Sequence, residues 1–399
     1  MNSTITKKIT IANNQEFLDT LKVFKVNIDK NQTISKQTYF SIDYINKKLT
    51  IKNFDFYNYL INTFSIETDL VLPNQDFLVD TEQLFDVLKS CKKMDVLEIT
   101  LKDTFLNIGG FNLFFKDFKE LQQSDLEVFK RSTIATETSQ NNVKNLLEFN
   151  IDTNLFLKNI KNSLNFASKE QGRENLDGVA IKFKENGLGF YATNNSFLIK
   201  INNFHNFNNL NTCKEDFFVL PTKLCKNLVA SVDILKDNIK IVLNNHNDFI
   251  KIFSDNLKIK GRLIAGYFPD ADKIIPSGEA FKINLKTDVF LNAIKMVNKV
   301  ADSGPLHLNL NNNTLLLTKK KGSDILFQLP INFNCDNKVI DYNICFKSEL
   351  LLKCIQTYKN FTNQDDIFIS FQDGHRPLKI ECLDDNEQAI TILLMPTTP

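Results

Sequence analysis

The four histidines, the side chains most often used for acid–base chemistry and metal binding, are scattered along the chain. They are His205, His246, His307 and His375, and none lies in an HExxH or GxSxG motif. No GxxxxGK[ST] loop is present to cradle a phosphate. Carboxylates are numerous but diffuse, so their spacing identifies no general acid–base pair. The sequence therefore nominates no catalytic residue and disfavours an enzyme.

Glycines and cysteines also lack the spacing of a cofactor or metal site. Gly187 and Gly189 are not followed by the rest of a dinucleotide-binding fingerprint, and Gly109-Gly110 is expected to form a hairpin turn. The cysteines never occur as CxxC, which argues against zinc and against a disulfide framework. We expect buried free thiols, no metal and no cofactor. The cysteines are Cys91, Cys213, Cys225, Cys335, Cys345, Cys354 and Cys382.

Lysines, by contrast, cluster on helices that the apolar periodicity predicts. On a single helix, lysines opposite an apolar stripe usually form a solvated face. If equivalent helices faced a common centre, their lysines would form one positive surface that contacts DNA phosphates without distinguishing bases. The lysines on these helices are Lys89, Lys92 and Lys93; Lys158 and Lys161; Lys223 and Lys226; Lys295 and Lys299; Lys353 and Lys359.

The elements that carry these lysines recur in a weak threefold repeat. Phe17-Leu18, Phe156-Leu157 and Phe290-Leu291 each lie where an alternating strand runs into an amphipathic helix. A second strand and helix follow each pair, with Leu84, Leu224 and Leu350 at matching positions. Four residues later, Leu88, Leu228 and Cys354 complete an apolar pair on one helical face.

The repeat predicts an α+β fold of three similar domains, each with two helices packed on antiparallel sheets. We place the domains at residues 1–140, 141–278 and 279–399, because 132–145 has no apolar periodicity and 276–278 reads Pro-Ser-Gly. Short strands are expected at 49–53, 179–184, 189–193, 239–243, 314–318 and 367–371.

Composition sets wider bounds on the protein. The 399 residues are 43% hydrophobic and 24% charged, as expected for a folded soluble protein of two or three domains. The formal net charge of +1 gives no global attraction to nucleic acid or membrane, so any DNA contact depends on where charges are placed. No apolar stretch is long enough to span a bilayer, and the N-terminus lacks the apolar core of a signal peptide. We expect a cytoplasmic protein without membrane partners.

Several segments resemble one known family. Residues 261–276, GRLIAGYFPDADKIIP, resemble the signature that closes the middle domain of the bacterial DNA sliding clamp, the beta subunit of the replicative DNA polymerase holoenzyme. The C-terminal TILLMPTTP resembles that family's hydrophobic-Met-Pro ending. Residues 174–200 match the strand pair of the middle domain, and DGHRPLKIE resembles the penultimate strand region. All three domains align in order, although the first matches mainly by pattern.

The resemblance implies a non-enzymatic processivity factor. Three clamp domains per chain would form a ring as a head-to-tail homodimer around double-stranded DNA, independently of DNA sequence. The implied partners are the replicative DNA polymerase, the clamp loader and other proteins that carry a clamp-binding motif. Lys169 and Arg173 fall where the family has a DNA-contacting loop.

The resemblance also implies a hydrophobic partner-peptide cleft between the middle and last domains. Where many members carry Asp-Gly-His-Arg after the cleft threonine, this chain has Asn194-Asn195-Ser196-Phe197, so the polar rim is altered. Carried over by matched positions, the cleft residues are Leu176, Thr193, Leu198, Pro269, Lys273, Ile274, Leu350, His375, Pro377, Leu393, Leu394, Met395 and Pro396.

Two alternatives stay open on the sequence alone. The chain could be a clamp-like interaction protein that binds clamp-binding peptides without encircling DNA. It could also be an α+β enzyme that uses dispersed carboxylates, which predicts turnover or a tightly bound ligand.

Overall fold

The computed structural model consists of two compact units. The N-terminal unit is formed by the described residues of Met1–Lys158 and Lys223–Leu263, and the C-terminal unit by those of Asn159–Leu210, Glu215–Thr222 and Ile264–Pro399. The structure describes residues 7–102, 104–117, 147–170, 172–184, 187–204, 217–244, 248–300, 305–311, 313–321, 324–335, 342–362, 364–384 and 388–397.

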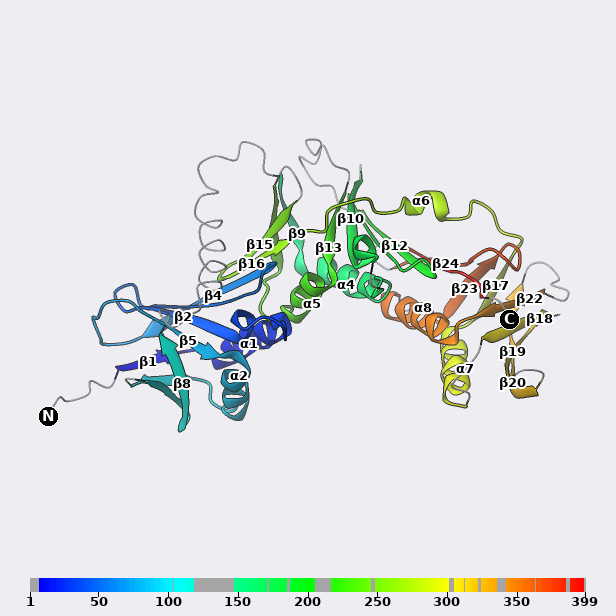
Figure 1. The fold of residues 1–399 in the computed structure, drawn as a ribbon. Coiled ribbons are helices and arrows are strands. Elements are labelled where there is room, and N and C mark those ends of the chain that lie inside the picture. The colour runs from blue at the N-terminus through cyan, green and yellow to red at the C-terminus, as the bar shows by residue number, and fades with distance from the viewer. Residues whose placement is uncertain are drawn as a thin grey trace. The chain divides into compact units, whose positions relative to one another are not determined.

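The N-terminal unit is built on a 12-stranded sheet in the order β1-β6-β7-β8-β5-β2-β3-β4-β16-β15-β14-β9, with neighbours antiparallel (Figure 1). Its strands are β1 (Lys7–Ile11), β2 (Gln37–Asp43), β3 (Lys48–Phe54), β4 (Asn58–Glu67), β5 (Gln75–Asp80), β6 (Leu97–Leu101), β7 (Phe105–Ile108), β8 (Phe111–Asp117), β9 (Leu147–Asp152), β14 (Asn238–Leu243), β15 (Phe249–Ser254) and β16 (Leu257–Arg262). Its helices are α1 (Asn14–Asn27), η1 (Ile34–Lys36), α2 (Thr81–Ser90) and α5 (Thr222–Ala230). The first residue of α5 belongs to the C-terminal unit, and α4 (Thr153–Leu164) begins in the N-terminal unit and ends in the C-terminal one.

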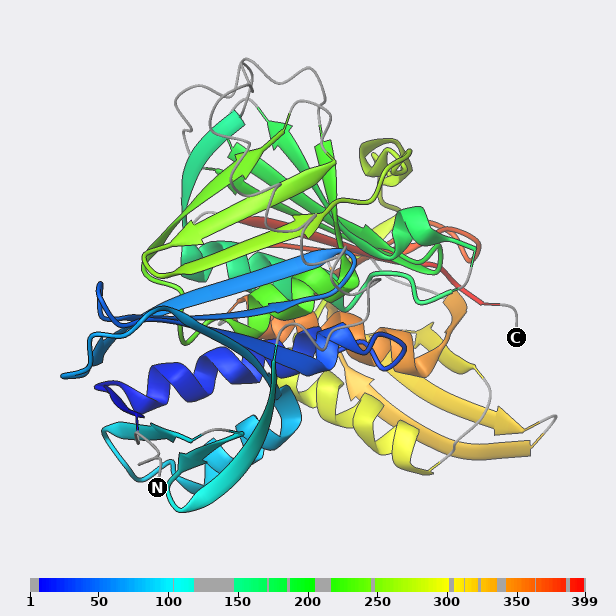
Figure 2. The ribbon, with the colours of Figure 1, turned by 60° about the vertical axis from the view of Figure 1, so that its left-hand side comes forward.

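Local sequence explains where the first two helices begin. The side chain of Asn13 caps α1 by accepting from the Glu16 amide at 3.0 Å, and Asp80 caps α2 in the same way through the Gln83 amide at 2.9 Å. The apolar stripe of α1 places Phe17 fully out of solvent against the sheet. The helices α1 and α2 lie side by side, as Figure 2 also shows.

The C-terminal unit contains two antiparallel sheets. A nine-stranded sheet has the order β13-β10-β11-β12-β25-β24-β23-β17-β21, and a four-stranded sheet has the order β20-β19-β18-β22. The first holds β10 (Gly178–Lys184), β11 (Gly187–Thr193), β12 (Phe197–Phe204), β13 (Phe217–Pro221), β17 (Phe281–Lys286), β21 (Asn334–Cys335), β23 (Asp366–Phe371), β24 (Leu378–Leu383) and β25 (Ala389–Leu394). The second holds β18 (Leu306–Asn311), β19 (Thr314–Lys321), β20 (Asp324–Asn332) and β22 (Tyr342–Phe346). The helices are η4 (Glu174–Leu176), α6 (Ala271–Ile274), α7 (Thr287–Val300) and α8 (Ser348–Phe361), with α7 beside α8.

The predicted α+β fold of helices on antiparallel sheets is confirmed. Each strand expected from alternation lies within one of β3, β10, β11, β14, β19 and β23. Gly109 and Gly110 form the two-residue turn between β7 and β8, with φ of 54° and 88°, as the type I′ hairpin requires. The predicted linker at 132–145 lies outside the described residues, and the domain boundaries stay predictions.

One member of the apolar pair predicted for the third repeat is wrong. Leu84 and Leu88 of α2 are fully buried, as is Cys354 of α8, but Leu350 is only half-buried and Leu351 takes the buried position. Adjacent residues of a helix point about 100° apart, so only one of these two leucines can face the core, and the leucine pattern alone did not decide which.

Buried thiols were also expected. Cys91, Cys225, Cys345 and Cys354 are buried, whereas Cys335 and Cys382 are half-exposed. Cys213, His205 and His246 lie outside the described residues. In the part of the chain that the structure describes, no helix combines the length and apolar character needed to cross a membrane.

Candidate functional site

A row of apolar side chains crosses three neighbouring strands of the nine-stranded sheet. Thr193 on β11 pairs with Leu198 on β12, which pairs in turn with Leu393 on β25. Directly opposed residues in antiparallel strands project to the same face, so these three side chains share one surface. All three are buried, which means that another part of the chain covers this face.

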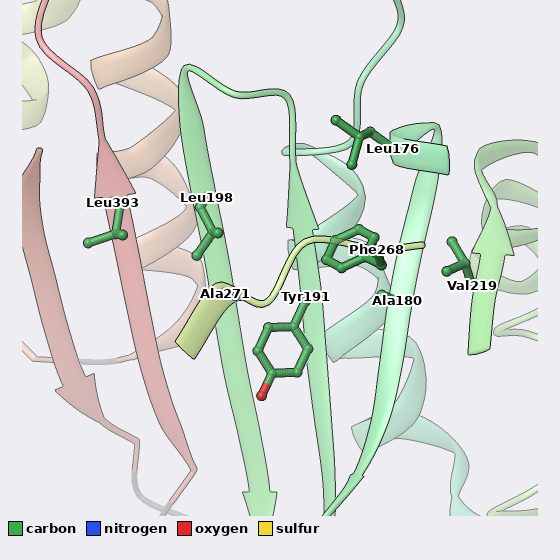
Figure 3. Packing of buried hydrophobic residues seen from close by; sticks show 8 residues of the cluster. All are labelled: Leu176, Ala180, Tyr191, Leu198, Val219, Phe268, Ala271 and Leu393. Carbon is green, nitrogen blue, oxygen red and sulfur yellow. The ribbon is translucent and has the colours of Figure 1, made fainter. Parts of the chain in front are cut away.

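The cover is the segment 264–276, which we call the strap. Its residues Phe268 and Ala271 are buried in a cluster with side chains of β10, β11 and β12 beneath (Figure 3). One end is held by the Ile264 amide, which donates to the Val219 carbonyl at 3.0 Å. The cluster consists of Leu176, Ala180, Tyr191, Leu198, Val219, Phe268, Ala271 and Leu393.

A small cavity of about 150 Å³ lies between the strap and this sheet surface, and we call it the strap cavity. It brings together Pro269 and Ile274 from the strap with β-sheet residues and the exposed Met395. Its lining is Thr193, Asn195, Phe197, Leu198, Pro269, Ile274, Leu393 and Met395. Six of these were predicted for the cleft, whereas Asn195 and Phe197 were identified in the sequence only as part of the altered rim.

The rim of the strap cavity is the tight turn between β11 and β12. Asn195 occupies the left-handed region with φ of 70°, a conformation that asparagine tolerates well. The Thr193 hydroxyl donates to the Phe197 carbonyl at 2.9 Å and accepts from the Asn195 amide at 3.2 Å. The Asn194 side-chain oxygen accepts from the amides of Ser196 and Phe197. These oxygens stabilise the turn itself.

The other residues predicted for the cleft are distributed more widely. Leu176 joins the buried cluster, and Lys273 lines a second cavity beside the strap. Leu394 is fully buried, and strand alternation points it to the face opposite Leu393. Like Leu176 and Leu394, four further residues line none of the cavities described here: Leu350, His375, Pro377 and Pro396.

The second cavity, of about 240 Å³, mixes aromatic and charged groups. Tyr191, Phe217 and Tyr267 line it together with Lys182 and acidic residues of the strap. Tyr191 is buried, and burial raises the pKa of its hydroxyl. Because the strap cavity also touches Pro269, the two cavities lie against the same short segment.

Asp272 on the strap carries two ion pairs to the sheet below. Its carboxylate lies 2.6 Å from the Lys200 ammonium and 3.0 Å from the Lys184 ammonium. Partial burial opposes ionisation, but hydrogen bonds from Lys200 and Lys184 outweigh it and hold the pKa of Asp272 below its ordinary value. The carboxylate is therefore ionised at neutral pH.

Most lysines predicted to face DNA are exposed in the unit to which each belongs. Lys295, Lys353 and Lys359 line a cavity of about 450 Å³ beside α7 and α8. Lys158 is half-buried. The exposed members are Lys89, Lys92, Lys93, Lys161, Lys169, Lys226, Lys295, Lys299, Lys353 and Lys359.

Three of the predicted DNA-facing cations pair with carboxylates. Arg173 lies 2.9 Å from Glu170, a neighbour in the same loop, and Lys359 pairs with Asp288. Lys223 pairs with Asp55, whose side chain is fully buried. The Lys223 ammonium is thus part of a structural ion pair.

One cysteine–histidine pair resembles a catalytic dyad in composition. The Cys345 sulfur lies 2.9 Å from Nδ1 of His307 on the neighbouring strand. Burial raises the pKa of the Cys345 thiol and lowers that of His307, so both groups are held neutral. A reactive thiolate requires the opposite shifts. Among the described residues, no group of histidine, cysteine and carboxylate side chains could hold a metal ion.

Comparisons with known proteins agree with this geometry. Residues 150–270 match the family described as DNA polymerase III beta subunit, central domain. The chain is similar to the beta sliding clamp of Mycoplasmopsis pulmonis, with 24% identity over 97% of this chain and 95% of the relative.

Solved structures extend the likeness to the whole fold. The Thermotoga maritima DNA polymerase III beta subunit superposes with a TM-score of 0.80 at 17% identity, covering 98% of this chain and 99% of that one. A sliding clamp from Bartonella birtlesii, bound to griselimycin, also gives 0.80 at 17% identity, over 98% of this chain and 100% of that one.

Proposed function

We propose that the chain is a bacterial DNA sliding clamp, the processivity factor that tethers DNA polymerase III to its template. The observation that carries the proposal is the strap cavity, which is lined by Pro269 and Ile274 of the family-like segment 261–276 and by Leu393 and Met395 near the C-terminus. A clamp acts by topology and binding, so it needs no catalytic group.

The strap cavity fits the side chain of a short hydrophobic motif. Leu198, Leu393, Ile274 and Met395 provide apolar walls, and a small apolar groove with few polar groups is the usual way to anchor a peptide. We propose that polymerase, clamp loader and other motif-bearing proteins insert such a residue here. The predicted cleft residues outside the cavity that keep exposed surface would then contact the rest of the peptide; they are Lys273, Leu350, His375, Pro377 and Pro396.

The exposed lysines support contact with double-stranded DNA through phosphates alone. Each lysine that neutralises a phosphate adds about one unit to the salt dependence of binding. Lys226, Lys299 and Lys353 are exposed on three different helices and carry this role in the proposal. We also place the protein in the cytoplasm, where the replication machinery works.

Two exposed apolar side chains support assembly into a ring of two chains. On β20, an edge strand of its sheet, Ile325 is 54% exposed, and on β8 of the other unit, which pairs with both β7 and β5, Phe114 is 75% exposed. Covering such side chains in a contact with a second chain favours association. When two chains bind each other through unlike surfaces and the arrangement closes, they form a head-to-tail ring.

Solution mass and topology together test this proposal. Light scattering should give twice 45.9 kDa for the native chain, and Phe114→Glu or Ile325→Lys should lower it to the monomer mass. After treatment with a clamp loader and ATP, the protein should remain on nicked circular DNA and leave the same DNA once it is linearised. A monomer at every concentration, retained equally on both DNAs, would refute the ring and favour a protein that only binds peptides.

A further inference from the structure

The strap cavity is bounded by a segment that two lysines hold in place. We propose that Asp272, Lys184 and Lys200 form a positioning ion-pair cluster, called the strap clamp, which fixes the distance between the strap and the sheet and so sets the width of the strap cavity. The inference rests on the proposed peptide-binding function and concerns how the cavity is kept open to the right size.

The position of Asp272 within the strap is the first argument. Pro269 and Ile274, the two strap residues that line the cavity, lie three residues before it and two after it. Asp272 and Ile274 are on α6, and Pro269 directly precedes its N-cap residue Asp270, whose carbonyl accepts from the Lys273 amide at 3.2 Å. A shift of Asp272 therefore moves both cavity-lining residues.

The sheet side of the strap clamp is carried by paired strands. Lys200 is on β12, two residues after the cavity-lining Leu198, and its partner across the strands is Tyr191 on β11. Lys184 is on β10, and its ammonium lies 5.8 Å from the centre of the Tyr191 ring. Both cations are thus carried by the strands that form the floor of the cavity or adjoin it, so the ion pairs connect floor and wall directly.

Partial burial strengthens these ion pairs relative to surface pairs. The side chains of Asp272, Lys184 and Lys200 are 36%, 34% and 19% exposed. A carboxylate shared by two such ammonium groups interacts more strongly than an isolated exposed pair. The strap's other polar attachments lie toward its beginning, through the Ile264 amide and the Tyr267 carbonyl, which accepts from the Asn175 amide group at 2.9 Å.

Peptide binding tests the strap clamp with a matched set of variants. Asp272→Asn should weaken binding of a fluorescent peptide carrying a hydrophobic clamp-binding motif by about threefold to tenfold. Asp272→Glu keeps the charge and should retain affinity within about twofold. Asp366→Asn removes the exposed Lys286–Asp366 pair, 2.8 Å apart on strands away from the strap, and should leave affinity unchanged. Equal affinity for Asp272→Asn and the native chain would overturn the proposal, as would equal losses for Asp272→Asn and Asp272→Glu.

A second measurement needs no peptide. The chain has no tryptophan, so Tyr267→Trp on the exposed part of the strap gives a single fluorescent reporter. Adding Asp272→Asn should shift its emission and speed hydrogen exchange of the Ile275 amide, while Asp366→Asn should change neither. Unchanged exchange would overturn the strap clamp even if peptides bind. If the native chain binds no peptide, the proposed function fails while this measurement still reports on the strap.

Discussion

Replacing Lys223 by methionine should destabilise the N-terminal unit. The ammonium of Lys223 pairs with Asp55, whose side chain is completely buried and also accepts from the amides of Tyr57 at 2.7 Å and Asn58 at 2.6 Å. Lys223→Met leaves that carboxylate buried without its cation. Removing one partner of a buried ion pair costs about 3–5 kcal/mol.

The expected loss lies below that range for two structural reasons. The two backbone amides continue to stabilise the carboxylate, and the Lys223 side chain is 30% exposed, so water already screens part of the attraction. We therefore expect a loss of about 2 kcal/mol in the free energy of unfolding. For a unit of roughly two hundred residues, that loss lowers the melting temperature by about 4–8 °C.

Calorimetry of Lys223→Met and Lys226→Met separates structural from DNA-binding roles. Both residues are on α5, but Lys226 is exposed. Lys226→Met should keep the native melting temperature and reduce the salt dependence of DNA binding, whereas Lys223→Met should melt earlier. A double-mutant cycle with Asp55→Asn should give a coupling energy of at least about 1 kcal/mol. Equal melting temperatures for the two lysine variants would refute the reasoning.

Three further predictions follow from other parts of the structure. Met395→Ala should weaken peptide binding about fivefold in fluorescence anisotropy without changing the melting temperature, because this residue lines the strap cavity while 40% exposed. Gly109→Ala should lower stability to urea by about 2 kcal/mol, and Gly110→Ala by less, because a Cβ at Gly109 would lie 2.4 Å from the Cys91 sulfur whereas one at Gly110 meets no atom within 4 Å. Burial raises the pKa of Tyr44 to about 12, so folding favours the neutral hydroxyl. The contribution of Tyr44 to the free energy of unfolding is therefore complete below about pH 10 and is lost as the pH rises toward 12. Tyr44→Phe should reduce this loss of stability when urea denaturation is measured across that pH range.

The elements that bury apolar stripes could be predicted from the sequence. Phe17, Phe156 and Phe290 are all fully buried, each near the start of a helix that the repeat predicted. Burial of a stripe depends on periodicity within one element, which a single sequence displays. The misplacement of Leu350 shows the limit of this inference, because a shift of one residue turns a helical side chain by about 100°.

Side-chain partners were much harder to foresee. Lys223 and Lys226 look alike in the sequence, yet one pairs with a buried carboxylate 168 residues away and the other is exposed. Likewise, Asp272 meets lysines 72 and 88 residues distant. Such pairs depend on strand register and on loops that cross the sheet, which local patterns do not encode. Counting lysines on helices therefore overestimates the cations available to DNA.

At the altered rim of the strap cavity, the structure changes how the polar residues identified in the sequence are interpreted. By resemblance, the sequence identified Thr193 as a cleft residue and Asn194 as part of an altered polar rim. In the structure, their oxygens bond to the amides and carbonyl of the turn that carries them. A peptide that used those oxygens would have to break these hydrogen bonds, at about 1 kcal/mol each. If the cavity binds peptides as proposed, recognition there should depend on how well an apolar side chain fills it, and the strap that is proposed to set its width should be the main determinant of which peptides bind.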